Sequence, residues 1–354
     1  MADWRLDLFR SMPKAELHMH LDGAVGVRTA MQLGRAAAPQ GQGGEWLSSY
    51  EAAHRKLVIG GPLSRQGELL GYYDTPLSLL QDAGAIDRVM GELLRGKAGD
   101  GVRYCEIRWA PRLHLGGGMS LRQALESVVA AKKRHCRRTG LRASLIAVGM
   151  RGEKPEANIG MLRQIAEAGL AGEIAAVDLA GNEADSPDPM LHAGFFAEAR
   201  RMGLGVTLHC GELPGSAAAV RAAVESIRPD RVAHGAPAAC DRGLCRLLRD
   251  SGIQLDLCPT SNIQAGLYSG YRAFPLMALR GMGVPVSIST DSPVISGLSL
   301  SEEYFMMSSL GGVAPAELWA INLASLEHIF APESVKAGLR AEFAEWARGV
   351  GELA

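Results

Sequence analysis

The sequence of 354 residues contains no apolar run close to the about 20 residues that a membrane-spanning helix needs. Its 37 basic and 38 acidic side chains nearly balance, and no long basic run is present, so neither nucleic acid nor an anionic membrane surface is an expected partner. The 6 cysteines are scattered, form no CxxC pair and no dense framework, and lie mostly in apolar surroundings, which predicts reduced thiols. The N-terminal stretch is too charged for a secretory signal peptide. These absences predict a cytoplasmic protein and leave its oligomeric state open.

Several catalytic signatures are also missing. The sequence has no HExxH motif, no GxSxG motif and no HxE with PCxxC, which marks the cytidine-type deaminases. The first predicted strand is not followed by the Gly-rich turn of a dinucleotide-binding sheet. The segment Gly91–Lys97 imitates a phosphate loop, but Ala98 follows it where Ser or Thr is required, and the stretch is helical in pattern. These classes of enzyme are therefore disfavoured.

Short apolar, β-branched runs recur along the chain, and stretches with helical periodicity follow them. A first strand ends at His18 and His20, and the other predicted strands are Val102–Trp109, Ser144–Val148, Ile174–Ala180, Gly205–His209, Arg231–His234, Ile253–Cys258 and Val284–Thr290. Strands that alternate with helices pair in parallel, and eight of them close a barrel. We therefore expect one (β/α)8 TIM-barrel domain over residues 1–354, with an open doubly wound sheet as the alternative.

Residues 24 to about 98 separate the first two predicted strands by far more than one crossover helix. This length predicts a helical insertion after strand 1. The loops that follow barrel strands lie at the C-terminal face, where such enzymes keep their active sites. We therefore expect the insertion to cover a site.

Polar side chains gather where predicted strands end. They are His18, His20, His209, Glu212, His234 and Asp291. The strand ends of a barrel converge on one mouth, and the two histidines of the first strand point to the same side of it. Imidazole and carboxylate ligands suit zinc, which also needs an open position for water in a catalytic site. Each side chain alone is as compatible with a core residue or a helix cap, but together they favour a metal centre.

Glu212 lies three residues after His209, on the turn that ends a predicted strand. A carboxylic acid in a dry pocket beside a metal site can have its pKa raised enough to donate a proton near neutrality. We favour this role over capping of the next helix. Solvated or capping side chains are the default expectation for the other histidines, which are His54, His114, His135, His192 and His328.

Six segments carry a more specific signal, in this order: Pro13–Gly23, Asp178–Glu183, His209–Glu212, Arg231–Gly235, Cys258–Asn262 and Ser289–Pro293. Together they resemble the adenosine deaminase family of the amidohydrolase superfamily. The resemblance implies a zinc-dependent hydrolase that converts adenosine or a closely related purine nucleoside to the 6-oxo product and ammonia. A deaminase of another aminated heterocycle and a catalytically silent nucleoside-binding relative are the alternatives.

The resemblance also implies roles for individual residues. One Zn²⁺ per chain would be held by His18, His20, His209 and Asp291. Glu212 would protonate a ring nitrogen, His234 would orient or deprotonate the attacking water, and Asp291 would belong to the catalytic group.

The substrate contacts that the resemblance implies are Asp22, Leu69, Leu70, Tyr73, Gly181 and Ser292. Asp22 stands where adenosine-specific relatives hold a ribose hydroxyl. Ser292 departs from the family, which usually has a second aspartate there. A hydroxyl can donate to a ring nitrogen, but it is shorter than a carboxylate and neutral. A modified purine therefore stays open as a substrate.

Overall fold

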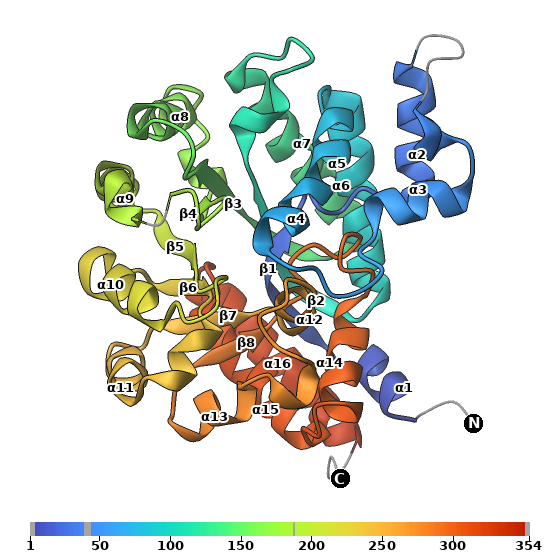
Figure 1. The fold of residues 1–354 in the computed structure, drawn as a ribbon. Coiled ribbons are helices and arrows are strands. Elements are labelled where there is room, and N and C mark those ends of the chain that lie inside the picture. The colour runs from blue at the N-terminus through green and yellow to red at the C-terminus, as the bar shows by residue number, and fades with distance from the viewer. Residues whose placement is uncertain (1–3, 39–43, 187, 351–354) are drawn as a thin grey trace.

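The computed structural model describes residues 4–38, 44–186 and 188–350, and a barrel of eight parallel strands forms its centre (Figure 1). The strands pair in sequence order, and they are β1 (Lys14–His20), β2 (Val102–Trp109), β3 (Arg142–Met150), β4 (Ala176–Ala180), β5 (Gly205–Cys210), β6 (Arg231–His234), β7 (Gln254–Leu257) and β8 (Val286–Ile288). All eight predicted strands are present, although several end a few residues from the predicted boundary. The expected TIM barrel is therefore confirmed, and the open sheet is wrong.

The barrel is joined between β1 and the segment after β8 by backbone hydrogen bonds. The N–H of His20 donates to the carbonyl of Asp291 at 2.8 Å, and the N–H of Asp291 donates to the carbonyl of His18 at 3.1 Å. The hydroxyl oxygen of Ser289 accepts the N–H of His18 at 3.1 Å. Asp291 has a φ of 62°, a left-handed conformation that is unfavourable for a residue with a side chain. The strained residue Asp291 and the hydrogen bonds that close the barrel therefore lie at positions predicted to bind the metal.

Helices surround the strands (Figure 1). Those of the barrel repeat and the C-terminal part are α6 (Ala83–Gly99), α7 (Leu121–Thr139), α8 (Pro155–Glu167), α9 (Ala193–Arg201), α10 (Ala217–Ile227), α11 (Arg242–Asp250), α12 (Pro259–Gln264), α13 (Leu276–Gly281), α14 (Leu300–Ser309), α15 (Pro315–Ser325) and α16 (Glu333–Val350), and α1 (Trp4–Ser11) precedes the barrel. Local signals explain their ends: Ser120 and Gln123 form a capping box before α7, and Gly140 ends it in a left-handed conformation. Among the described helices, none has the length and apolar character to cross a membrane.

The segment between β1 and α6 forms the predicted helical insertion. It contains α2 (Val27–Ala37), α3 (Tyr50–Leu57), α4 (Gln66–Leu70), the 3-10 helix η2 (Gly71–Tyr73) and α5 (Asp74–Leu79). Leu69 of α4 packs in a small buried cluster with Ile59, Ala265 and Ile295. Ala265 and Ile295 belong to the segments that follow β7 and β8, so α4 lies over the carboxyl ends of the strands (Figure 1).

The inside of the barrel carries charged side chains, which we call the ion array: Glu106, Arg108, Asp178, Arg231 and Asp256, all fully buried. Arg231 is hydrogen-bonded to Glu106, and its Nε lies 3.1 Å from Oδ2 of Asp256. Arg108 contacts Oδ2 of Asp256 at 3.4 Å and Oδ2 of Asp178 at 2.8 Å. Two guanidinium groups thus face three carboxylates in a continuous chain across the barrel.

We predict that Arg231→Met lowers the free energy of unfolding by about 3–5 kcal/mol, because Glu106 and Asp256 then stay buried without this cation. Urea unfolding followed by circular dichroism measures the change. Arg249→Met is the matched control, since Arg249 is half-exposed and pairs with its neighbour Asp250, and its stability should stay at the wild-type value. Wild-type stability of Arg231→Met would contradict the prediction.

Candidate metal centre and active site

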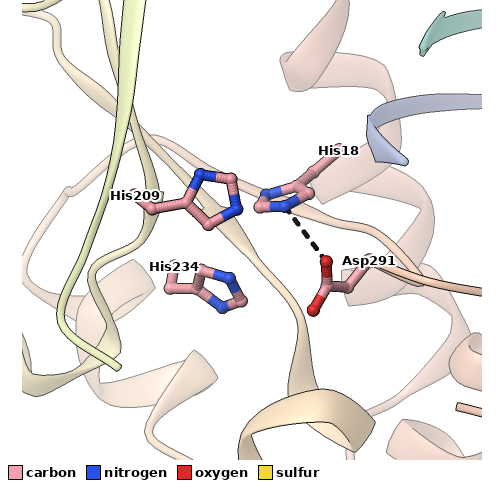
Figure 2. Close-up of side chains that lie close together, drawn as sticks. All are labelled: His18, His209, His234 and Asp291. Atoms are coloured by element: carbon pink, nitrogen blue, oxygen red, sulfur yellow. Dashed lines mark ion pairs between the residues drawn. The ribbon is translucent and has the colours of Figure 1, made fainter. Parts of the chain in front are cut away.

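Four donor atoms from β1, β5 and the segment after β8 meet at the mouth of the barrel. Nε2 of His20 lies 3.3 Å from Nε2 of His18 and 3.1 Å from Nε2 of His209. Oδ1 of Asp291 lies 3.3 Å from Nε2 of His18 and 3.4 Å from Nε2 of His20. Figure 2 shows His18, His209 and Asp291 turned toward a common point. All four side chains are buried, so the structure brings the four predicted ligands together.

These separations suit donors to one shared metal ion. Atoms that bind the same zinc ion at about 2.0–2.1 Å lie about 3–4 Å apart. Burial lowers the pKa of His20 to about 4 and lowers that of His18 as well, so both rings are neutral at pH 7. A neutral imidazole has a lone pair free for a metal. The donor set therefore fits a zinc ion by both spacing and protonation.

His234 lies beside this group rather than in it. One donor atom of each of the four residues in Figure 2, which are His18, His209, His234 and Asp291, lies within 4.8 Å of the others. The distances from His20 to its neighbours, 3.1–3.4 Å, are shorter. Nδ1 of His234 is 3.1 Å from the amide nitrogen of Asn262, and Nε2 is 3.5 Å from Oε1 of Glu212. Its φ of 68° is again left-handed, and burial lowers its pKa. A neutral ring is thus held so that Nε2 faces Glu212.

Glu212 follows β5 on a tight turn. Gly211 has a φ of 94°, and a Cβ there would come within 3.0 Å of backbone, so the turn requires glycine. The N–H groups of both residues donate to Oε2 of Glu183 at 3.3 Å. Burial, reinforced by the charge of Glu183, raises the pKa of Glu212 to about 8. This carboxyl group is therefore mostly protonated at neutral pH.

A cavity of about 390 Å³ lies in front of these groups, a volume suited to a small organic molecule. Its wall includes Glu212 and three of the four metal-donor residues, His20, His209 and Asp291. It also includes five of the six predicted substrate contacts: Asp22, Leu69, Leu70, Tyr73 and Gly181. Ser292 is not part of the wall, because its hydroxyl is hydrogen-bonded to that of Tyr73, which lies on the cavity side. Burial and the charge of Asp291 raise the pKa of Tyr73. A larger hollow of about 940 Å³ lies at the opposite pole, beside Phe330, away from this chemistry.

Asp22 is held from behind by a histidine that the sequence did not single out. Its Oδ1 lies 2.8 Å from Nε2 of His114, and its Oδ2 accepts the N–H of Ala110 at 3.1 Å. Burial lowers the pKa of His114, but Asp22 and the carbonyl of Leu80 together outweigh it, so the pKa is raised. The expectation of a solvated or capping side chain is wrong for His114, and also for His135 and His192, which are buried where their segments pack inward.

Other supporting residues were also missed. Oδ2 of Asp178 lies 2.9 Å from Nδ1 of His209, so the ion array ends at a candidate ligand. Ser261 donates to Oδ2 of Asp291 at 2.6 Å, and Asn262 next to it contacts His234. A lone acid inside the apolar run of β4 was the available signal for Asp178. The polar sequence of Ser261 and Asn262 directly after β7 was the signal for the others.

We predict that Asp178→Asn weakens Zn²⁺ binding about 10- to 100-fold, because Nδ1 of His209 loses its carboxylate partner. Competition with a chromogenic chelator measures the affinity. Asp256→Asn is the matched comparison: it removes another buried carboxylate of the ion array but leaves His209 its partner, so its loss of affinity should be clearly smaller. Equal affinities of the two variants would contradict a specific effect of Asp178 on His209.

The fold and this site together define a barrel enzyme with a candidate metal centre at the carboxyl ends of its strands. A family profile described as adenosine deaminase matches residues 13–346. An adenosine deaminase of Clostridium perfringens is 31% identical over 336 residues, which cover 93% of this chain and 97% of that relative. The chain belongs to the adenosine deaminase family, and it is therefore a hydrolase that acts on C–N bonds.

Solved structures share the fold. An adenine deaminase from Arthrobacter aurescens has a TM-score of 0.86 at 22% identity, covering 95% of this chain and 99% of that one. An amidohydrolase from Burkholderia ambifaria with bound Zn has a TM-score of 0.83 at 24% identity, covering 98% and 93%. The N6-methyl-AMP deaminase from Arabidopsis thaliana has a TM-score of 0.82 at 24% identity, covering 97% and 99%. Their named activities differ, so the shared fold does not select a substrate.

Proposed function

We propose that this protein is a zinc-dependent deaminase that converts adenosine, or a closely related purine nucleoside, to the 6-oxo product and ammonia. The observation that supports it most is that four metal-donor atoms cluster together, and that three of the four donor residues line one cavity with Glu212, whose raised pKa favours a protonated carboxyl group. The named activity of the Clostridium perfringens relative agrees with this substrate.

One Zn²⁺ per chain would be held by His18, His20, His209 and Asp291. When bound, it would supply an activated water at neutral pH. Glu212 would donate its proton to the ring nitrogen beside the carbon that bears the amino group, so that negative charge does not build up there. His234 would orient the attacking water through Nε2. Water adds to that carbon, ammonia leaves, and the ring keeps the oxygen.

The cavity wall would hold the remainder of the nucleoside. Asp22 would accept a ribose hydroxyl, since each carboxylate oxygen has lone pairs beyond its present hydrogen bond. Gly181 would offer its backbone N–H to a ring nitrogen, and its φ of 123° is a conformation that favours glycine. Leu69 and Leu70 of α4 would cover the sugar. These contacts favour a nucleoside over free adenine.

Glu212→Gln should keep its metal and lower kcat by about 10²- to 10⁴-fold, because an amide donates a hydrogen bond but transfers no proton. Ammonia release and metal content measure the two effects. Glu303→Gln is the control, since burial also raises the pKa of Glu303 to about 8, but this residue bonds Thr260 and does not line the cavity. Full turnover by Glu212→Gln would remove the acid role.

A substrate panel tests the proposed function as a whole. We expect adenosine or a modified adenosine to be the best substrate among adenosine, 2′-deoxyadenosine, N6-methyladenosine, adenosine 5′-phosphate and adenine. Free adenine should have a kcat/KM lower by about 10-fold or more, because the sugar contacts no longer contribute binding energy in the transition state. Failure of the zinc-loaded protein to release ammonia from every compound would reject a deaminase, and a preference for adenine would reject a nucleoside enzyme.

A further inference from the structure

Tyr73 and Ser292 form a pair of hydroxyl groups at the cavity that the proposed reaction does not use. Tyr73 ends η2 in the insertion, and Ser292 directly follows Asp291. Their hydroxyl oxygens are hydrogen-bonded although 219 residues separate them in the chain. The Tyr73 ring also meets the ring of His20 edge-to-face, with centroids 6.1 Å apart. The phenol is thus held at two points beside the candidate ligands.

The space for this pair exists because residues 23 and 292 are small. A Cβ on Gly23 would lie 2.3 Å from Oγ of Ser292, so glycine is needed for the serine to fit. Ser292 itself is buried, and Tyr73 lies between it and the cavity. A longer side chain at position 292 would take the place of the phenol hydroxyl. A residue of the insertion therefore presents the polar group that meets a ligand here.

The number of protons on the two hydroxyl groups determines which ligand groups the pair can recognise. Two hydroxyl groups carry two protons, and their mutual hydrogen bond uses one. With Ser292 as the donor of that bond, the phenol proton is available to an acceptor in the cavity. A carboxylate at the same place would donate only after taking up a proton, whereas the hydroxyl pair donates while neutral. The chemistry therefore fits an unprotonated ring nitrogen.

We propose that the hydroxyl group of Tyr73, aligned by Ser292, is a specificity-determining contact that donates to a ring nitrogen of the substrate. The inference rests on the proposed function and adds to it the ligand class, a heterocycle with an acceptor nitrogen at the edge that faces Tyr73. In a purine nucleoside this acceptor is the free nitrogen of the five-membered ring. Recognition of that edge then depends on the insertion being seated on the barrel.

The test compares kcat/KM for adenosine with kcat/KM for 7-deazaadenosine, which has a C–H group in place of this nitrogen. Wild type should prefer adenosine, and Tyr73→Phe should reduce the preference about 10-fold through a loss on adenosine alone. Ser292→Ala should also reduce the preference for adenosine, but by less, because Tyr73 keeps its proton and loses only the hydrogen bond that orients its hydroxyl group. Tyr72→Phe is the matched control, since Tyr72 packs against the same apolar cluster as Tyr73. Its preference for adenosine over 7-deazaadenosine should equal that of wild type.

An unchanged ratio in Tyr73→Phe, or no preference in wild type, would overturn the proposal. A loss of preference in Ser292→Ala alone would assign the contact to Ser292 and overturn it as well. A faster reaction of Tyr73→Phe with adenosine would show that the phenol obstructs the site, which is equally incompatible with the proposal. If wild type releases ammonia from neither compound, the proposed function fails. The affinities of the two nucleosides, measured by calorimetry on the same variants, then test the contact with Tyr73 independently of turnover.

Discussion

The hydrogen bonds between β1 and the segment after β8 hold the site together as well as the barrel. His18, His20 and Asp291 take part through their main-chain groups, while their side chains carry the converging donor atoms. The left-handed backbone of Asp291 turns its carboxylate inward, and Ser261 fixes the second oxygen. The spacing of these three donors is therefore set by the closure of the barrel, before any ion contributes. The strained residue is stabilised by the bonds that its conformation makes possible.

Charge in this region is unbalanced in a way that suits a cation. The ion array sets three carboxylates against two guanidinium groups, and Asp291 adds another carboxylate nearby. Burial keeps the imidazoles of His18, His20 and His234 neutral and Glu212 mostly protonated, so none of these offsets the excess. A dication would compensate this buried negative charge. Electrostatics and donor spacing thus favour the same occupant.

Local pattern was enough to predict the barrel and the gathering of polar side chains at its mouth, because strand alternation and strand ends are local properties with a known place in this fold. The choice of four ligands among those side chains came from the family resemblance. Contacts made by the insertion were not predictable in the same way. Periodicity says that α4 and η2 are helical, but not that Tyr73 reaches Ser292 or that His114 lies behind Asp22. The ion array was missed because Arg108 and Asp178 look like interruptions of apolar strands until the strands surround a common axis.

At the end of the ion array far from the cavity, Arg231 contacts the segment that precedes the last helix. Nη1 of Arg231 bonds the carbonyl of His328 at 2.9 Å, and its guanidinium carbon lies 4.0 Å from the ring centroid of Phe330, both in the segment that joins α15 to α16. From there the charges run without a gap to His209 at the mouth. Loosening of the C-terminal helices would thus alter the electrostatic potential at the candidate metal centre even if no atom there moved, which would make the last part of the chain a remote influence on any cation held there.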